Sequence, residues 1–217
     1  MFLGHFGLGL AGKRAAPELS LGTLFLATQW ADLVFFPLAL AGIEHFRIAP
    51  GATVVTPLDF YDYPWSHSLV ALTAWGLFVG GVYYAFRRSR AGFWVLAAGV
   101  VSHWVLDVVV HRRDVPVGFS GPYLGLRLWD SRPWTLVAEV VTFGAGVALY
   151  LRTTAAKDRT GAWSFWALVV LLAAAWLASV LGPPPPDERT VEYTGVAMWI
   201  FVPWGWWIDR HRAIVRS

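Results

Sequence analysis

Three ionisable residues near the middle of the chain, His103, Asp107 and His111, follow one another at intervals of four. In an α-helix this spacing places them on one face, with about 6 Å between successive positions. Imidazole and carboxylate groups arranged in this way can ligate one divalent metal ion or two adjacent ions. A single histidine such as His103 is equally well explained by packing against a neighbouring helix. The metal hypothesis therefore depends on which other residues share this depth.

The composition indicates that membrane helices must position these side chains. Residues of the set AVILMFWYC make up 57% of the 217-residue chain and charged residues only 14%, against about 25% charged residues in soluble domains. These values exclude a soluble enzyme, a disordered chain and a nucleic-acid module, so no nucleic-acid partner is expected despite the net charge of +3. The absence of cysteine excludes disulfides and thiolate metal sites, and the 14 Trp residues fit aromatic belts at the membrane interfaces.

Apolar segments predict an all-α, polytopic membrane protein with about six transmembrane helices and a single integral membrane domain over residues 1–217. Five segments are long enough to cross about 30 Å of hydrocarbon, and the sixth, with about 17 residues, is shorter and rich in Trp. The six segments are 19–42, 64–86, 91–111, 133–152, 162–182 and 192–208. Residues 1–152 hold the candidate metal-site helices, and residues 153–217 add two further helices.

Basic residues alternate along the chain in a way that predicts orientation. Eleven of them fall at the same ends of the six segments, and such an excess marks the cytoplasmic side. These are Lys13, Arg14, Arg87, Arg88, Arg90, Arg152, Lys157, Arg159, Arg210, Arg212 and Arg216. We therefore expect both termini in the cytoplasm and the longer loops, 43–63 and 112–132, on the outer side, where they can cover a site.

The apolar stretch at residues 1–11 is too short to span a membrane, and its basic residues follow it rather than precede it, unlike those of a signal peptide. If Lys13 and Arg14 mark the inner face, the stretch can form a half-helix that reaches about 15 Å into the membrane. His5 would then lie near mid-depth. The alternative is an amphipathic anchor on the membrane surface.

Ionisable residues inside predicted spans are costly and therefore indicate function. Asp32, His67 and Glu139 come from three different segments and, with His103 and Asp107, fall at similar heights in the outer half of the membrane. No Lys or Arg lies inside the spans to neutralise the carboxylates. Either they are protonated or cations lie between them, and divalent metals bound by histidine and carboxylate meet that need.

The order of these motifs resembles a known family. Gly4-His5, Asp32, Ser66-His67-Ser68 and Ser102-His103-x-x-x-Asp107 are similar to the hallmarks of the YdjM-type inner-membrane proteins, a family of metal-dependent hydrolases. The resemblance covers about residues 1–145. It departs from the family where one carboxylate after Asp32 is missing, and where Asp62 stands in place of a histidine.

The resemblance implies a bacterial-type inner membrane and, through a distant similarity to zinc-dependent phospholipases C, a phosphoester or lipid substrate. It also implies two or three divalent ions, most simply zinc. With the residues above, the expected ligands are His5, Asp32, Asp62, His67, His103, Asp107 and Glu139.

The mechanism we expect is hydrolysis by metal-activated water on the outer side of the membrane, where a lipid or small phosphoester can reach the site. Asp107, Glu139 and His111 are the candidate catalytic residues, with His111 a peripheral ligand or a proton carrier. Arg127 and Arg132 could bind a phosphate. The competing interpretation is that Asp130 compensates their charge.

Three other functions remain open. Pro64-Trp65-Ser66-His67 is similar to part of the metal-independent lipid-phosphate phosphatases, but neither lysine of the chain supplies the Lys-x6-Arg-Pro element of that family. A metal-ion or proton transporter could use the same buried groups, although its polar trail would stop in the outer half. A non-catalytic membrane scaffold would not need four helices to aim histidines and carboxylates at one depth.

Overall fold

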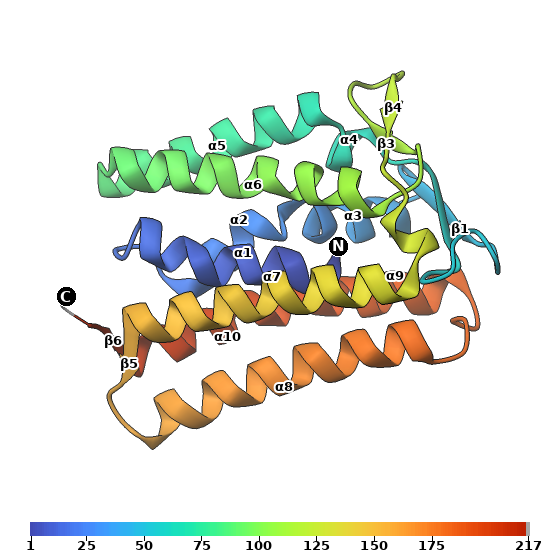
Figure 1. Ribbon diagram of the computed structural model, residues 1–217. Coiled ribbons are helices and arrows are strands. Elements are labelled where there is room, and N and C mark those ends of the chain that lie inside the picture. Colours follow the sequence, from blue (N-terminus) through green and yellow to red (C-terminus); the bar gives the residue numbers. More distant parts are fainter. Residues whose placement is uncertain (216–217) are drawn as a thin grey trace.

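The computed structural model describes residues 1–215 as an all-α bundle with short two-stranded sheets at its two ends (Figure 1), as the composition predicted. The helices are α1 (Phe2–Ala15), α2 (Leu21–Thr28), α3 (Trp30–Leu40), α4 (Pro64–His67), α5 (Leu69–Arg87), α6 (Arg90–Val110), η1 (Leu128–Asp130), α7 (Arg132–Thr153), α8 (Arg159–Leu181), α9 (Glu188–Ala197), η2 (Met198–Ile200) and α10 (Phe201–Arg210). The strands are β1 (His45–Ile48), β2 (Leu58–Asp62), β3 (Val115–Pro116), β4 (Tyr123–Leu124), β5 (Thr154–Ala156) and β6 (Arg212–Ile214).

Four helices, α5 to α8, are long and apolar enough to cross a membrane, and they correspond to the predicted segments between residues 64 and 182. In the most apolar stretch of each helix, only 28–33% of the residues are buried inside the protein. Most of their apolar side chains therefore face outward, and such a surface is stable against lipid rather than water. The protein thus has the helices of a membrane protein.

The first and last predicted spans are not continuous helices. Segment 19–42 is divided into α2 and α3, which meet at Gln29 with a bend of 59° and form a fifth crossing only if the pair is counted as one. Segment 192–208 is divided between α9, η2 and α10. Pro203 lies in the first turn of α10, where a missing N–H is tolerated, whereas it would break a helix continuing from α9. The prediction of six uninterrupted spans is therefore not confirmed.

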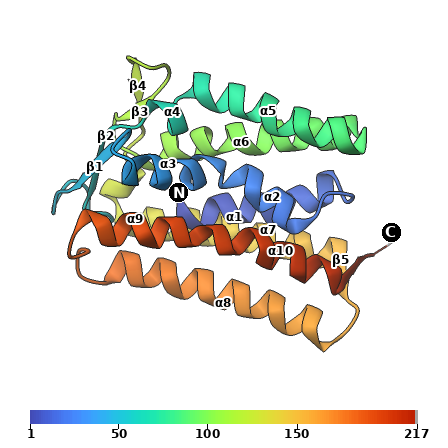
Figure 2. The same cartoon turned by 180° about the vertical axis from the view of Figure 1, so that it is seen from behind.

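Helix α1 lies inside the bundle and packs against α7, α2, α6 and α8. The N-terminus is surrounded by helices in both views (Figures 1 and 2). Close approach to α7 depends on glycine, since a Cβ on Gly146 would overlap the carbonyl of Gly7. Small residues allow this kind of helix contact inside membranes. Residues 2–15 are thus a buried helix, not an anchor on the protein surface, and His5 lies within the bundle.

Hairpins formed by the two longer loops cover one end of the bundle. Strands β1 and β2 pair antiparallel with Phe46 opposite Phe60, and β3 pairs with β4. Phe46 packs with Phe35 and Tyr63 in a small aromatic core beneath the first hairpin. At the other end, β5 pairs with β6. The hairpin-covered end is where the ionisable residues meet.

Candidate metal centre

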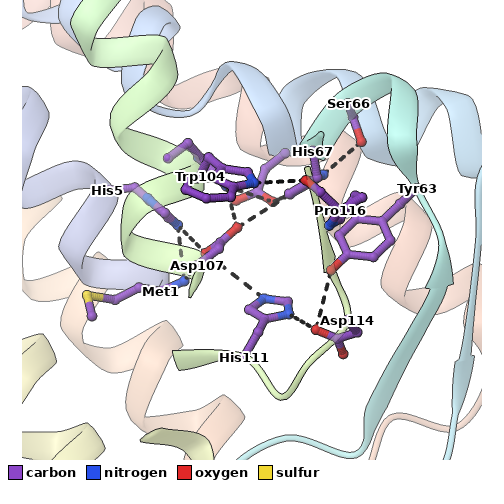
Figure 3. Close-up of polar contacts among 12 residues, drawn as sticks. Met1, His5, Tyr63, Ser66, His67, Trp104, Asp107, His111, Asp114 and Pro116 are labelled. Carbon is purple, nitrogen blue, oxygen red and sulfur yellow. Dashed lines mark hydrogen bonds and ion pairs between the residues drawn. The ribbon is translucent and has the colours of Figure 1, made fainter. Parts of the chain in front are cut away.

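Five of the seven predicted ligands converge to one point near the hairpin-covered end, and Figure 3 labels three of them, His5, His67 and Asp107. They are His5 of α1, Asp32 of α3, His67 of α4, and His103 and Asp107 of α6. They form two overlapping groups whose ligand atoms lie within 4.8 Å of one another, His5–His103–Asp107 and Asp32–His67–His103. All are buried except Asp32, whose side chain is 23% exposed. We refer to these five residues as the His–Asp cluster.

Two carboxylate oxygens of the cluster face the same two imidazoles. Asp107 Oδ2 lies 3.3 Å from His103 Nε2 and 3.7 Å from His67 Nε2. Asp32 Oδ1 lies 3.7 Å from His103 Nε2 and 3.5 Å from His67 Nε2. These separations are longer than good hydrogen bonds between nitrogen and oxygen. The four groups therefore surround a common point without closing on one another.

Each inward-facing imidazole is fixed through its other nitrogen. His103 Nδ1 lies 2.9 Å from the carbonyl oxygen of Thr28, at the break between α2 and α3. His67 Nδ1 lies 2.7 Å from the hydroxyl of Ser66. Partners of this kind orient the ring and leave Nε2 available, as is usual for metal-ligating histidines.

His103 Nε2 is a buried polar atom with no hydrogen-bond partner. Because a carbonyl oxygen can only accept, His103 must donate to Thr28 through Nδ1–H. In the neutral ring Nε2 then carries a lone pair that faces the oxygens of Asp32 and Asp107 at 3.7 and 3.3 Å. In the charged ring its N–H would lack a well-aligned acceptor. Neither state satisfies this nitrogen, whereas coordination of a cation would.

The donor set passes a test of fit for zinc. A tetrahedral ion with bonds of about 2.0–2.2 Å has ligand–ligand edges of roughly 3.3–3.6 Å. The four nitrogen–oxygen separations around Asp32, His67, His103 and Asp107 run from 3.3 to 3.7 Å. Two imidazoles and two carboxylates also form a neutral site with a divalent ion. These residues could therefore hold a divalent ion such as zinc.

The other oxygen of Asp107 faces α1. Oδ1 accepts a hydrogen bond of 2.7 Å from the amino group of Met1 and lies 3.1 Å from His5 Nε2 (Figure 3). The His5 ring stacks on His103 with 3.6 Å between ring centroids, and its Nδ1 is buried without a partner. Asp107 thus presents one oxygen to each of the two groups.

Two predicted ligands do not join either group. Glu139 accepts hydrogen bonds of 2.9 Å from the N–H groups of Phe2 and Gly4, so its carboxylate satisfies the first turn of α1. Asp62 is about half exposed and pairs with His45 at 3.1 Å. Asp62 stands opposite His45 at the end of β2 and therefore does not join the five residues.

His111 lies beside the cluster rather than within it. Its Nε2 is 4.0 Å from Asp107 Oδ1, and its Nδ1 is 3.0 Å from Asp114 Oδ1. Tyr63 donates to the same Asp114 oxygen at 3.5 Å (Figure 3). Burial, aided by the negative charge of Asp114, raises the pKa of Tyr63 well above its usual value, so the hydroxyl stays protonated. The ring of His111 is thus held with one nitrogen toward the cluster.

A cavity of about 200 Å³ opens beside the cluster. Its polar lining includes Glu139 and His111 together with members of the cluster. Its apolar lining includes Leu58 from the first hairpin and Trp176 and Val180 from α8. Helix α8 therefore helps to line the cavity, and no sequence motif indicates this.

The two candidate phosphate-binding arginines have different surroundings. Arg127 Nε donates to Asp130 at 2.6 Å on the surface, which supports charge compensation. Arg132 has no carboxylate within 4.0 Å in residues 1–215, and its guanidinium donates at 3.2 Å to the carbonyl of Val54. Arg127 therefore has a carboxylate partner and Arg132 has none among residues 1–215, although the sequence alone does not distinguish them.

Glu44 lies between α3 and β1 and supports the site from outside the cluster. It is 1% exposed, and its Oε1 accepts from the N–H groups of Trp65 and Ser66 at 2.7 and 2.9 Å. These bonds hold the start of α4, the short helix that carries His67. A buried glutamate 21 residues before Trp65 leaves no local pattern that could have revealed this contact.

Comparison with known proteins gives no assignment: the chain matches no protein-family model, no curated protein and no solved structure.

Proposed function

We propose that the protein is a membrane-embedded, metal-dependent hydrolase. The observation that carries the proposal is His103, whose Nδ1 is committed to the Thr28 carbonyl while its buried Nε2 faces two carboxylates without a partner. A purely structural histidine would be expected to use both ring nitrogens in hydrogen bonds. The surrounding separations of 3.3–3.7 Å support a divalent ion rather than direct contact.

Asp32, His67, His103 and Asp107 would hold the ion. A second ion could use Asp107 Oδ1 and His5 Nε2 by displacing the amino group of Met1, which contacts them at 2.7 and 3.1 Å. We therefore propose a site for one or two zinc ions. A third ion finds no further group of donors in the part of the chain that the structure describes.

When bound, zinc would polarise an ester or phosphoryl oxygen and lower the pKa of water toward about 7. The protein's own groups would orient the reaction. His111 Nε2 faces the cavity and could accept or return a proton, while Asp114 holds the opposite nitrogen. Glu139 would keep α1, and with it His5, in register with the cluster. Trp176 and Val180 would exclude bulk water from the apolar side.

The proposed substrate is a lipid or small phosphoester that reaches the site from the outer side of an inner membrane. The distribution of basic residues supports this orientation, with six crossings, two of them in broken helices, and both termini cytoplasmic. The cavity supports an amphiphile, because both ionisable members of the cluster and apolar side chains line it.

The test is metal analysis and hydrolysis by purified protein in detergent, without added zinc. We expect at least one equivalent of zinc and slow hydrolysis of phosphomonoester or phosphodiester lipids that chelation abolishes. His103→Ala should lose both the metal and the activity. His45→Ala is the matched control, since His45 pairs only with the half-exposed Asp62. A wild-type protein without a stoichiometric transition metal, or a His103→Ala variant with unchanged metal content, would refute the proposal.

A metal-ion transporter is the second candidate, and the break between α2 and α3 favours it. Broken helices line ion sites in many transporters. Here the bend lies at Gln29, whose buried side-chain amide has no partner, next to the carbonyl that His103 contacts. Uptake of zinc into proteoliposomes, together with no hydrolysis of any ester, would favour transport. Hydrolysis without uptake would favour the enzyme.

A further inference from the structure

A second pocket adjoins the cavity of the His–Asp cluster. Its volume is about 180 Å³, and it lies among loop 50–57, the start of α7, the end of α8 and the prolines that follow. Val55, Thr56, Ser179 and Val180 line both pockets. The two pockets therefore share part of their lining. We call it the Arg132 pocket, after the one ionisable residue among those that line it.

Arg132 has most of its hydrogen-bonding capacity free. Its guanidinium makes one hydrogen bond to protein, to the Val54 carbonyl at 3.2 Å. A guanidinium has five N–H donors in a planar fork, which matches two oxygens of a phosphate or carboxylate. No carboxylate within residues 1–215 lies close enough to occupy it.

This lack of a partner distinguishes Arg132 from most arginines near the same end of the molecule. Four others are paired with carboxylates: Arg47 with Asp59, Arg112 with Asp59 and Asp114, Arg127 with Asp130, and Arg189 with Glu192. Arg113 is also without a carboxylate partner among the described residues, and like Arg132 it is exposed, but it lines neither pocket. A free guanidinium combined with a pocket therefore occurs at Arg132 and not at Arg113.

The rest of the pocket supplies few competing donors. Five prolines line the pocket, and proline has no backbone N–H to donate. They are Pro50, Pro57, Pro183, Pro184 and Pro185. The hydroxyl of Thr53 already bonds to the backbone of Thr56, and that of Ser179 donates to the Trp176 carbonyl. An anion in this pocket would thus be recognised chiefly by Arg132.

We propose that the Arg132 pocket binds an oxyanion group of the substrate, either phosphate or carboxylate. The substrate is then an anionic amphiphile that extends from the His–Asp cluster, past Val55 and Val180, to Arg132. The placement of the scissile bond at the cluster rests on the proposed function. The anion-binding pocket itself does not, because it needs no metal and no catalysis.

Direct binding is measured on Asp107→Asn protein treated with chelator, so that no metal can hold the anion. Inorganic phosphate and dihexanoyl phosphatidic acid are titrated by calorimetry in a zwitterionic detergent. Arg132→Gln should weaken binding by roughly tenfold or more, the value of a charge-assisted hydrogen bond, and Arg132→Lys should weaken it less. Arg113→Gln is the matched control for the loss of one exposed charge and should bind like its parent.

The two probes separate the possible sources of the anion. Equal binding of both supports a pocket for a free phosphate group, and binding of the lipid alone supports a headgroup with its chain. Absence of binding in the parent protein would overturn the proposal, and so would equal losses in Arg132→Gln and Arg113→Gln. In zinc-loaded wild-type background, Arg132→Gln should raise KM and leave kcat nearly unchanged. If wild-type protein hydrolyses nothing but still binds phosphate through Arg132, the proposed function fails and the pocket stands.

Discussion

The two ends of α1 lie in two buried ionisable clusters of opposite character. At the C-terminal end of α1, Lys13 Nζ donates to Asp209 Oδ2 at 2.5 Å and to the Leu19 carbonyl at 2.6 Å. Asp209 also accepts from the N–H of Leu21 at 2.9 Å and from the hydroxyl of Tyr150 at 2.8 Å. The cation and the anion of this pair thus both have hydrogen-bond partners.

At the N-terminal end of α1, some buried polar atoms lack a hydrogen-bond partner. His5 Nδ1 and His103 Nε2 are buried and unpartnered, and Asp32 and Asp107 face the same histidines at 3.3–3.7 Å. Low polarity makes an unsatisfied buried group costly, so a cluster of this kind persists where a ligand completes it. The difference teaches that burial of charge alone does not mark a functional site. The state of hydrogen-bond satisfaction separates a structural clamp from a candidate centre.

The largest effect is expected from breaking the ion pair of Lys13 and Asp209. Lys13→Met leaves Asp209 buried without its cation, and loss of one partner of a buried ion pair costs roughly 3–5 kcal/mol. The free energy of unfolding in detergent measures this loss. Arg14→Met is the matched control, because Arg14 is exposed and should change stability little.

The same variant sharpens the contrast between the two ends. Zinc should stabilise the Lys13→Met protein by the same increment as wild type, about 2.7 kcal/mol at a free concentration 100-fold above the dissociation constant. Distant, independent sites are additive in this way. Loss of zinc binding in Lys13→Met would show that the two ends are coupled and would contradict the separation drawn here.

A smaller effect is expected from loosening the His–Asp cluster without removing one of its five residues. Glu44→Ala frees two N–H groups at the start of α4 and lets His67 move. Positioning groups of this kind typically contribute 10- to 100-fold to metal affinity. Zinc affinity by competition with a chromophoric chelator measures it. Glu188→Ala removes a comparable bond, from Ile48 N–H at 2.9 Å, away from the cluster. Equal affinities in both variants would exclude a positioning role for Glu44.

The smallest effect is expected at the exposed pair of Asp158 and His211, which are 2.8 Å apart beside the paired strands β5 and β6. The hydrogen bond from His211 lowers the pKa of Asp158 below its usual value. A carboxylate with a lowered folded pKa contributes stability above its unfolded value, about 3.9, and loses it as the pH falls through the folded value. Asp158→Asn should therefore lower Tm slightly at pH 7 and not at pH 2. A larger difference at the lower pH would have the wrong sign.

Periodicity and composition predicted the long helices α5 to α8, because an apolar run of this length has few stable alternatives in lipid. The breaks were not predicted. The bend at Gln29 depends on tertiary contacts, which include the bond of the Thr28 carbonyl with His103. Pro203 was a visible signal for the second interruption, since it fits only the first turn of a helix.

The candidate site was predictable where ligands repeat within one helix. His103 and Asp107 share a face of α6 by spacing alone, and their depth pointed to Asp32 and His67 on other segments. The assignment of Asp62 came from motif order, which carries no information on where a hairpin directs its side chain. The same limit applies to Arg127 and Arg132, which the sequence could not tell apart.

The sequence by itself determined that the chain is helical and suited to a membrane, and that a few ionisable residues lie among apolar ones. It did so because charge and apolar length are local properties of the chain. Tertiary structure alone decided which of these groups meet, which are satisfied and which are not. Glu139 accepts a hydrogen bond from the first turn of α1, and Asp209 pairs with Lys13. His103 has one buried nitrogen that faces two carboxylates without a hydrogen bond. Hydrogen-bond satisfaction depends on partners more than 100 residues apart, and only folding brings them together.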